Sequence, residues 1–382
     1  MISLPSRPRS AAGPLLMVDV DAIAANTRLF ATRAAGELIA VVKADGYGHG
    51  AVTVARTALA NGATQLGVTS IDEALALRRA GLTAPIISWL NHPADADFQT
   101  AVDHQVDIAV PSIEHLSSVA GVRGVARVHL HLDTGMARDG ARPTSWIDLC
   151  RAAGDAERRG AIRVVGLMGH LSDADVPGAP SNESGRVIFD WGIDVARRSG
   201  LRPRLLHLAA TTATLNLPGT HFTASRVGAG LVGIDLSRST RLAVPMTLTA
   251  PIVGVNAVSA GTPVGYGGEW IAPQSTRLGL VALGYADGLP RSASGRAEVL
   301  VRGRRHPIVG RLSMDQFVVD LGESGAGVGE LVTVFGPGCN GEPTITEWAG
   351  WSDTIDHEIV TRIGSRVSRD VVSSSLYSGA IA

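Results

Sequence analysis

The sequence predicts an α/β fold with an N-terminal (β/α)8 barrel of the TIM type and a C-terminal, mostly antiparallel β domain. Over residues 14–242, short apolar runs alternate with longer Ala-, Arg- and Leu-rich stretches of helical spacing. Buried strands that are each followed by a helix are typical of a parallel sheet, and eight such repeats match a barrel, which needs ~250 residues. From residue 243 on, β-branched runs separated by Gly and Pro indicate antiparallel strands. A doubly wound open sheet is the alternative for the first domain.

The eight expected barrel strands are apolar runs. They lie at residues 38–44, 65–69, 84–89, 107–110, 127–132, 164–169, 205–209 and 226–230. Residues 51–60, 71–81 and 181–200 are long enough for crossover helices, and several of these stretches end in Gly, a common helix stop. Ser70 followed by Glu73 predicts a capping box at the start of the second of these helices.

We place the β domain at residues 243–382. Its expected strands lie at residues 246–258, 277–285, 297–301, 316–321 and 331–335, and its expected helices at residues 346–351 and 358–363. An additional strand at residues 15–21 precedes the first helix and could pair with either domain.

The composition excludes several classes of protein. A hydrophobic content of 45% is too high for a disordered chain, and a formal net charge of −1 argues against nucleic acid or an anionic membrane as the main partner. Cys150 and Cys339 are too few for a disulfide framework or a cysteine zinc site, and we expect no metal. No apolar stretch reaches the ~18 residues of a membrane helix, and none follows the N-terminal arginines as in a signal peptide. A cytoplasmic location is therefore expected.

Lys43 is the only lysine among 34 basic residues, and it ends the first expected barrel strand. Catalytic groups concentrate at the C-terminal ends of barrel strands. Arginine can replace lysine as a surface cation, but it cannot lose its proton to act as an amine nucleophile or base. A lone lysine at this position therefore indicates amine chemistry, above all a Schiff base; the alternative is that drift in composition left one lysine by chance.

The loops after the seventh and eighth expected strands carry features of a phosphate site. Barrel enzymes often bind phosphate there, and in this chain these loops contain Thr211, Thr212, Gly228, Ala229 and Gly230. Hydroxyls and exposed backbone N–H groups are suitable donors for a phosphate. A Schiff-base lysine opposite a phosphate cradle is what pyridoxal 5′-phosphate needs, whereas the nucleotide P-loop pattern is absent.

One run of residues around Lys43 resembles the cofactor-attachment signature of a known family. The run AVVKADGYGHG, from residue 40, is similar to that of the alanine racemases, with Lys43 as the Schiff-base lysine. Seven further motifs follow in the family's order: VDVDAIAAN from residue 18, DEALALR from 72, DTGMAR from 133, RVGAGLVG from 226, VGYG from 264, GYADG from 284 and GRLSMDQ from 310. The resemblance covers residues 14–375.

The resemblance implies a pyridoxal-phosphate enzyme that racemises a small amino acid, most simply alanine. It also implies a head-to-tail homodimer in which the partner's β domain completes each active site. Lys43 and Tyr266 from the other subunit would be the two bases. Two bases on opposite faces of a planar intermediate can remove a proton from one side and return it to the other.

Further site residues are carried by the same motifs. Arg226 resembles the arginine that donates to the pyridine nitrogen, and its permanent charge would keep that nitrogen unprotonated and limit transamination. Arg138 resembles the arginine near the phenolic oxygen of the cofactor and the substrate carboxylate, and His170 resembles the histidine that links Arg226 to the tyrosine network. The other cofactor positions are Tyr47, Thr211, Gly228, Ala229 and His357; the other substrate positions are Tyr285 and Met314.

Some positions depart from the family pattern. His131 stands where many members carry a lysine, often carbamylated, that orients the nearby arginine. Ala210 replaces an asparagine, His357 replaces a tyrosine that contacts phosphate and narrows the entrance, and Val227 replaces a frequent proline. These changes predict a wider or more polar entrance, with an altered rate or substrate range.

Four alternatives stay open at this point, one of which is a non-catalytic descendant that uses the dimer surface. The chain could racemise serine or another small amino acid, or it could bind pyridoxal phosphate without racemising a substrate. A decarboxylase of the same fold is less favoured, because the motif at Ser313 and Met314 contains no cysteine.

Overall fold

The computed structural model describes residues 13–176 and 178–373, so the last nine residues of the expected β domain, 374–382, lie outside the described part. The described residues form two compact units. One spans residues 22–243; the other combines the residues up to 21 with those from 244 on. Within the described residues, no helix has the length and apolar character needed to cross a membrane.

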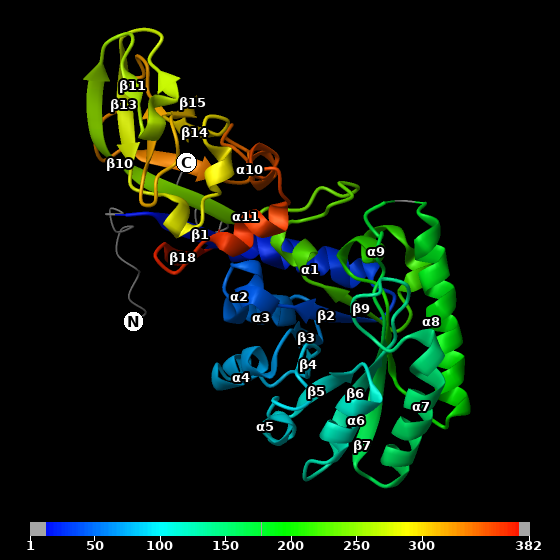
Figure 1. Cartoon of the computed structure of the whole chain (residues 1–382). Helices are drawn as coiled ribbons and strands as arrows, with labels where there is room; N and C mark the ends of the chain where they lie inside the picture. The colour runs from blue at the N-terminus through cyan, green and yellow to red at the C-terminus, as the bar shows by residue number, and fades with distance from the viewer. Residues whose placement is uncertain (1–12, 177, 374–382) are drawn as a thin grey trace. The chain divides into compact units, whose positions relative to one another are not determined.

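The unit of residues 22–243 is built on a parallel eight-stranded sheet (Figure 1). Its strands are β2 (Glu37–Val41), β3 (Gln65–Val68), β4 (Ile86–Ser88), β5 (Val106–Val110), β6 (Ala126–His131), β7 (Ile162–Met168), β8 (Leu205–His207) and β9 (Ala224–Val227). All eight fall at the positions expected from the apolar runs.

Backbone hydrogen bonds close this sheet into a barrel. In the sheet order β8-β7-β6-β5-β4-β3-β2-β9, the first and last strands lie at the two ends. The N–H of Thr223 donates to the carbonyl of Leu206 at 3.1 Å, and the N–H of Arg226 donates to the carbonyl of Ala209 at 2.9 Å. These bonds join the two ends, so the parallel barrel is confirmed and the open doubly wound sheet is wrong.

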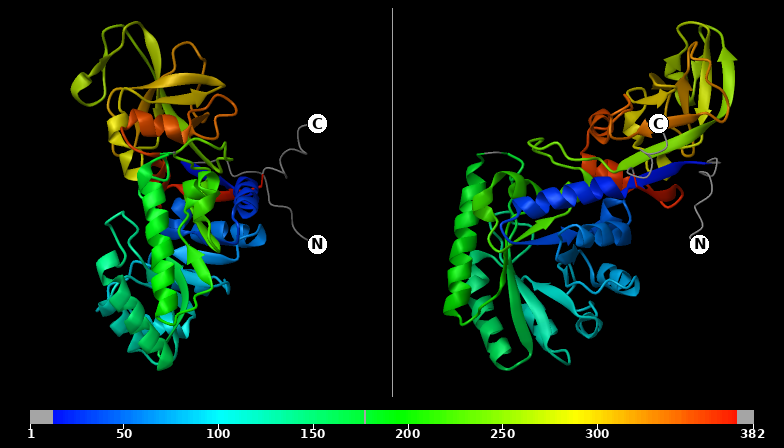
Figure 2. Two further views of the ribbon diagram at one scale, coloured as in Figure 1. Left: turned by 90° about the vertical axis from the view of Figure 1, so that its right-hand side faces the viewer. Right: turned by 180° about the vertical axis from the view of Figure 1, so that it is seen from behind.

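Helices follow the strands and cover the outside of the barrel. They are α1 (Val20–Arg33), α2 (Lys43–Tyr47), α3 (Ala51–Ala60), α4 (Ile71–Arg79), α5 (Phe98–Asp103), α6 (Ile113–Ala120), α7 (Pro143–Arg158), α8 (Pro180–Arg198) and α9 (Thr211–Asn216), with short 3-10 turns η1 (Pro218–Thr220) and η2 (Ala229–Val232). Figure 2 shows the long helices α7 and α8 on the outer face of the sheet.

The interior of the barrel contains an apolar cluster and a group of buried polar side chains. Apolar side chains from six strands form one cluster: Ile39, Ile87, Ala109, Met168, Leu205 and Ala224. Because side chains alternate between the two faces of a strand, the residue two places from each inward-facing one also points inward. Asp107, His207 and Arg226 are such residues, and all three are buried, so the barrel core contains polar groups beside its apolar layer.

The other unit contains a second eight-stranded sheet, mostly antiparallel. Its strands are β1 (Leu15–Asp19), β10 (Met246–Val258), β13 (Thr276–Val281), β14 (Glu298–Val301), β15 (Arg304–Val309), β16 (Phe317–Asp320), β17 (Leu331–Phe335) and β18 (Ser368–Val372), in the order β13-β16-β15-β14-β17-β10-β1-β18. An additional pairing of β13 with β10 closes six of them into a ring. The early strand β1 pairs with β10 antiparallel and with β18 parallel.

The remaining elements of this unit are short. They are the two-stranded ribbon β11 (Pro263–Val264) and β12 (Trp270–Ile271), the helices α10 (Ile345–Trp351) and α11 (Asp356–Arg362), and the 3-10 turns η3 (Tyr266–Gly268), η4 (Tyr285–Asp287) and η5 (Arg291–Ala293). The strand expected at residues 277–285 was drawn too long, because β13 ends at Val281 and Tyr285 already belongs to η4. The strand β15 was not expected from the sequence, because its first half is polar, with Arg304, Arg305 and His306.

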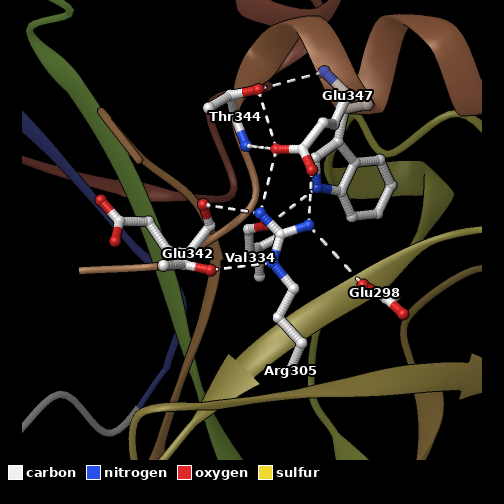
Figure 3. A network of polar contacts seen from close by, with 8 residues as sticks. Glu298, Arg305, Val334, Glu342, Thr344 and Glu347 are labelled. Carbon is white, nitrogen blue, oxygen red and sulfur yellow. Dashed lines mark hydrogen bonds and ion pairs between the residues drawn. The ribbon is translucent and has the colours of Figure 1, made fainter. Parts of the chain in front are cut away.

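Arg305 ties β15 to the start of α10 (Figure 3). Its Nε donates to the carbonyl of Gly341 at 2.8 Å, and its two terminal nitrogens reach the carboxylate of Glu347. The same carboxylate accepts the backbone N–H of Thr344, whose hydroxyl accepts the N–H of Glu347. This reciprocal capping box begins α10, so one arginine supports both a sheet edge and a helix start.

Replacing Arg305 with methionine is expected to lower the free energy of unfolding by about 1 kcal/mol, because a bidentate ion pair and two hydrogen bonds to backbone carbonyls are lost. The matched control is Arg296→Met, which removes the exposed pair with Asp353 and is expected to cost less than about 0.5 kcal/mol. Urea unfolding monitored by tryptophan fluorescence measures both values. Equal losses in the two variants would contradict this account of Arg305.

Candidate active site

Lys43 lies at the start of α2, directly after the end of β2 and therefore at the C-terminal rim of the barrel. The backbone that follows is left-handed: φ is +51° at Ala44, +53° at Asp45 and +55° at Tyr47. Such angles cost roughly 1 kcal/mol or more per non-glycine residue unless the surroundings enforce them. The turn is therefore a strained support for the only lysine of the chain.

Two carboxylates enforce this turn. Glu73 accepts the N–H of Ala44 and the N–H of Thr69, both at 2.8 Å, and Asp45 accepts the N–H of Ala51 at 2.9 Å. The predicted capping box of α4 is thus half wrong: the hydroxyl of Ser70 accepts the N–H of Glu73 as expected, but the Glu73 carboxylate turns to the lysine loop instead of to Ser70.

The surroundings of Lys43 favour a neutral amine. Burial lowers the pKa of Lys43, and the positive charges of Arg138 and Arg226 lower it further, while the carboxylate of Glu73 acts in the opposite direction. Its Nζ lies 6.0 Å from the centre of the Trp89 ring. A neutral amine is the form that can attack a carbonyl or accept a proton, so the environment prepares the lysine for the chemistry expected of it.

Arg226 is buried and held by four acceptors. Its Nη1 atom donates to Nδ1 of His207 at 2.9 Å and to the carbonyl of the same residue at 2.5 Å. Its Nη2 atom donates to the carbonyl of Gly169 at 2.6 Å and to Nδ1 of His170 at 3.2 Å. Burial lowers the pKa of Arg226 to about 10, so the guanidinium stays charged at neutral pH. Among the described residues nothing accepts from Nε, which leaves that N–H for a ligand.

Both histidines beside Arg226 are held neutral. Burial, followed by the charges of Arg226 and Arg138, lowers the pKa of His170 to about 3. Burial and the charge of Arg226 also lower the pKa of His207 well below its usual value. Since arginine can only donate, each Nδ1 must be an acceptor, and both rings therefore carry their proton on Nε2.

Three segments meet at a glycine-rich turn after β9. A Cβ placed on Gly228 would lie 2.4 Å from the Tyr47 hydroxyl oxygen, and one on Gly230 would lie 2.3 Å from the Phe30 ring. The hydroxyl of Thr211 accepts the N–H of Gly230 at 3.1 Å. No side chain larger than hydrogen fits at either glycine, so the backbone of this turn, including Ala229 at the start of η2, packs directly against Tyr47 and Thr211.

This turn suits an anionic group. It presents backbone N–H groups and hydroxyls without a carboxylate, and burial raises the pKa of Tyr47 to about 12, which keeps its phenol protonated. A protonated phenol can donate to a phosphate oxygen. With Lys43 and the unused Nε of Arg226 on neighbouring strand ends, the residues fit a phosphorylated heteroaromatic aldehyde such as pyridoxal phosphate.

Arg138 and His131 lie on and after β6. Arg138 is exposed and forms no hydrogen bond or ion pair with residues 13–176 or 178–373. His131 is buried, and its Nδ1 lies 3.4 Å from the carboxylate of Asp139. Burial acts to raise the pKa of Asp139, but the hydrogen bond and charge of His131 outweigh it and hold that pKa below its usual value. Where the family pattern has a lysine, this protein thus has the imidazole of His131, which lies beside the carboxylate of Asp139, the residue after Arg138.

The expected site residues of the β domain gather on adjoining loops of their own unit. The N–H groups of Tyr285 and Ala286 donate to the carbonyls of Ser313 and Met314 at 3.1 and 2.9 Å. Met314 is 53% exposed and Tyr266, in η3, is 72% exposed. The Tyr266 loop joins the same cluster, because a Cβ on Gly310 would lie 2.8 Å from the carbonyl of Val264. His357 lies on α11 of this unit.

Several residues of the site were missed from the sequence. Trp89 and Glu73 lie beside Lys43, and Asp107 and His129 continue the polar contacts of Arg226 into the barrel. The signal available was the period-two pattern of β5 and β6, in which polar residues alternate with buried aliphatic ones. That pattern shows that a polar side chain faces inward but not which side chain it meets.

The fold and this site define a lysine-centred barrel enzyme with a second, β-rich domain. Family comparison agrees on both parts: residues 18–235 match the N-terminal domain of alanine racemases and residues 245–371 the C-terminal domain. The chain belongs to the alanine racemase family.

Individual relatives span nearly the whole chain. The alanine racemase of Thermobifida fusca is 43% identical over 95% of this chain and 98% of its own length. The crystal structure of alanine racemase from Streptomyces lavendulae, a producer of D-cycloserine, superposes with a TM-score of 0.92 at 39% identity and covers 96% of this chain and 98% of that one. The Bartonella henselae enzyme, solved with covalently bound pyridoxal phosphate, has a TM-score of 0.85 at 25% identity over 94% and 100% of the two chains.

The substitution Glu73→Gln is expected to lower the pKa of Lys43, because the one carboxylate that opposes this shift loses its charge. It should also lower the free energy of unfolding by about 1–2 kcal/mol, since an amide cannot accept from two N–H groups in the carboxylate's geometry. Lys43 is the only lysine, so the pH dependence of its labelling by an amine reagent reports its titration when the label is read on the peptide that contains Lys43, apart from the α-amino group. Asp72→Asn, on the exposed face of the same helix turn, is the control and should change neither quantity.

Stability is expected to fall on acidification because of His170. Its folded-state pKa of about 3 lies below the usual 6.5, so between these values the unfolded chain binds a proton that the native state does not. The free energy of unfolding therefore falls as the pH is lowered from 6.5 toward 3, by up to about 1.4 kcal/mol per pH unit for this proton.

The variant His170→Asn keeps an acceptor for Arg226 but has no proton to gain, so its stability should depend less steeply on pH between 6.5 and 4. Urea unfolding at a series of pH values measures the two slopes. The exposed substitution His92→Asn serves as the comparison, and a flattening as large as that of His170→Asn would speak against this assignment.

Proposed function

We propose that this protein interconverts L- and D-alanine with pyridoxal 5′-phosphate as its cofactor. The observation that carries the proposal is the pairing of the chain's only lysine, half-buried with a lowered pKa, with a buried arginine that keeps one N–H free. The family of the chain and its near-complete match to alanine racemases support the same reaction.

The residues that would hold the cofactor come from the barrel rim. Lys43 would form the covalent attachment, and Arg226 would donate to the ring nitrogen through Nε, with His170 holding its guanidinium in place. Tyr47, Thr211, Gly228 and Ala229 would bind the phosphate, with His357 at the position where relatives have a tyrosine. Bound pyridoxal phosphate supplies a conjugated ring that stabilises negative charge on the substrate's Cα.

Proton transfer would need two groups on opposite sides of that carbon. Lys43 is one, since its neutral amine can accept a proton and return it. The other would be the partner subunit's Tyr266, the position to which the resemblance to alanine racemases assigns the second base. Arg138, Tyr285 and the backbone N–H of Met314 would hold the substrate carboxylate, which explains why these positions combine a cation with polar donors.

The proposal includes a homodimer with shared active sites. The high exposure of Tyr266 and Met314 in their own unit supports it, because residues that act in a partner's active site must be accessible in their own unit. A cytoplasmic location is part of the same proposal, and the free cysteines, Cys150 and Cys339, support it.

The purified protein is expected to carry pyridoxal phosphate that borohydride attaches permanently to Lys43, as peptide mass spectrometry would show. In D2O it should exchange the α-protons of both L- and D-alanine, and Lys43→Ala should abolish the exchange. Tyr266→Phe should lower the rate by about 10²–10⁴-fold, the contribution of one general base. Faster exchange of serine than of alanine would reassign the substrate, and attachment without any exchange would indicate a cofactor carrier.

Mixing the two inactive variants tests the shared site. If each site takes Lys43 from one chain and Tyr266 from the other, reassembled mixtures of Lys43→Ala and Tyr266→Phe should regain roughly one quarter of the original activity, because half of the dimers are mixed and each has one intact site. If both bases come from one chain, mixing restores nothing. The size of the dimer is checked by light scattering before and after mixing.

A further inference from the structure

A chain of polar side chains runs from Arg226 into the interior of the barrel. Nε2 of His207 lies 2.8 Å from Nδ1 of His129, and Nε2 of His129 lies 3.4 Å from a carboxylate oxygen of Asp107. That carboxylate also accepts two hydrogen bonds from Arg127, at 2.6 and 2.9 Å. His129 and His207 are fully buried, and Asp107 is 2% exposed.

The backbone leaves room for this series of hydrogen-bonded side chains. Asp107 lies near the start of β5, His129 in the middle of β6 and His207 at the end of β8, so the contacts climb from the lower half of the barrel to its C-terminal rim. A Cβ on Gly166, the register partner of His129 on β7, would lie 2.1 Å from Nδ1 of His129. Only glycine leaves room for this ring, and the strand register shifts at the same place.

The donors and acceptors of the chain can be arranged in only one direction. Arginine donates only, so Nδ1 of His207 accepts from Arg226 and the proton of His207 sits on Nε2. That proton points at Nδ1 of His129, which must then accept, so His129 carries its own proton on Nε2. This proton faces Asp107. Burial acts to raise the pKa of Asp107, but the hydrogen bonds from His129 and Arg127 outweigh it and hold that pKa below its usual value, so the carboxylate is ionised and accepts.

We propose that Asp107 and His129 are positioning residues that fix the tautomer of His207 and thereby hold Arg226 in the orientation that leaves its Nε–H free for the cofactor. Neither residue touches the reacting atoms. They act through His207, and the proposal rests on the function proposed above for Arg226. The negative end of this series of contacts lies at Asp107, remote from the rim, and the ring of His207 stays neutral.

The variant Asp107→Asn reverses this arrangement. The shortest contact, from Nε of Arg127 at 2.6 Å, keeps the amide oxygen at its side and places the amide NH2 toward both His129 and Nη2 of Arg127. The Arg127 side chain is partly exposed, so Nη2 can turn to solvent, whereas the buried His129 must accept. A donor there requires Nε2 of His129 to accept, which moves its proton to Nδ1 and forces the proton of His207 onto Nδ1 as well. Two donors, Nδ1–H of His207 and Nη1–H of Arg226, would then face each other, and the guanidinium would lose an acceptor and rotate.

The control is Arg127→Met. It removes the same ion pair between Arg127 and Asp107, but it leaves the carboxylate of Asp107 facing His129. If Asp107 serves only the stability of the barrel, the two variants should behave alike. If the carboxylate sets the tautomers, only Asp107→Asn should change them.

Solid-state NMR of protein labelled with 15N-histidine shows which ring nitrogen carries the proton, and the signals are assigned by difference with His129→Gln and His207→Gln. In the purified protein with and without added pyridoxal phosphate, both rings are expected to be protonated on Nε2, and in Asp107→Asn on Nδ1, while Arg127→Met keeps the original pattern. The affinity for pyridoxal phosphate, measured by equilibrium dialysis, should fall on the order of 10–100-fold in Asp107→Asn, the usual effect of losing a group that orients a ligand-binding residue, and less than about threefold in Arg127→Met.

Either of two results overturns the inference: unchanged tautomers in folded Asp107→Asn, or equal losses of affinity in the two variants. Circular dichroism identifies a variant that fails to fold, and Asp107→Glu, which keeps the acceptor, should then retain the Nε2 protons. Failure of the proposed function is recognised separately, because unmodified protein would then bind no pyridoxal phosphate at Lys43 while its histidine tautomers could still be read.

Discussion

The burial of one guanidinium, that of Arg226, sets the conditions that the rest of the site obeys. A charge removed from water must be surrounded by acceptors, or its desolvation would destabilise the fold by several kcal/mol. Here the acceptors are two backbone carbonyls at strand ends and two imidazole nitrogens. No carboxylate among residues 13–176 and 178–373 forms a hydrogen bond or ion pair with the guanidinium, so its positive charge remains largely uncompensated. Burial lowers the pKa of His170, His207 and Lys43, and the charge of Arg226 lowers all three further. Burial and this one cation therefore act in the same direction on the groups around it.

The carboxylate of Glu73 has two effects on Lys43. Glu73 opposes the fall in the Lys43 pKa, and the same carboxylate holds the left-handed turn that follows the lysine. Because one side chain controls both the charge and the backbone, the geometry and the reactivity of Lys43 are coupled. A free surface lysine would gain neither effect. The isolation of this residue among thirty-three arginines is consistent with a position at which only an amine with an adjustable pKa can serve.

The sequence predicts the scaffold better than the contacts inside it. Apolar runs located all eight barrel strands because strands buried on both faces must be apolar, and motifs pointed to Lys43 and Arg226. The strand β15 could not be predicted, because Arg305 gives its first half the polar composition of a loop. In the structure the same arginine binds the start of α10. The contacts of Asp107 and His129 could not be predicted for a different reason. His129 and His207 are 78 residues apart in sequence, and their contact depends on barrel closure and on a register shift at Gly166. No local pattern contains that information.

The replacement at residue 131 can be understood in the same terms. The resemblance to the family would place a lysine there, often carbamylated, as a negative group that orients the arginine at position 138. Here a buried imidazole occupies the position and pairs with Asp139, the residue next to Arg138, so a carboxylate is still present beside the arginine but comes from the following residue of the chain. Arg138 itself lies exposed, without a bond to any described residue. Its guanidinium is consequently less constrained than that of Arg226, and the two arginines differ as their roles would require. Arg226, which we propose to donate to the cofactor ring, is fixed by four acceptors, and Arg138, which we propose for the substrate carboxylate, is free of such bonds to the described residues.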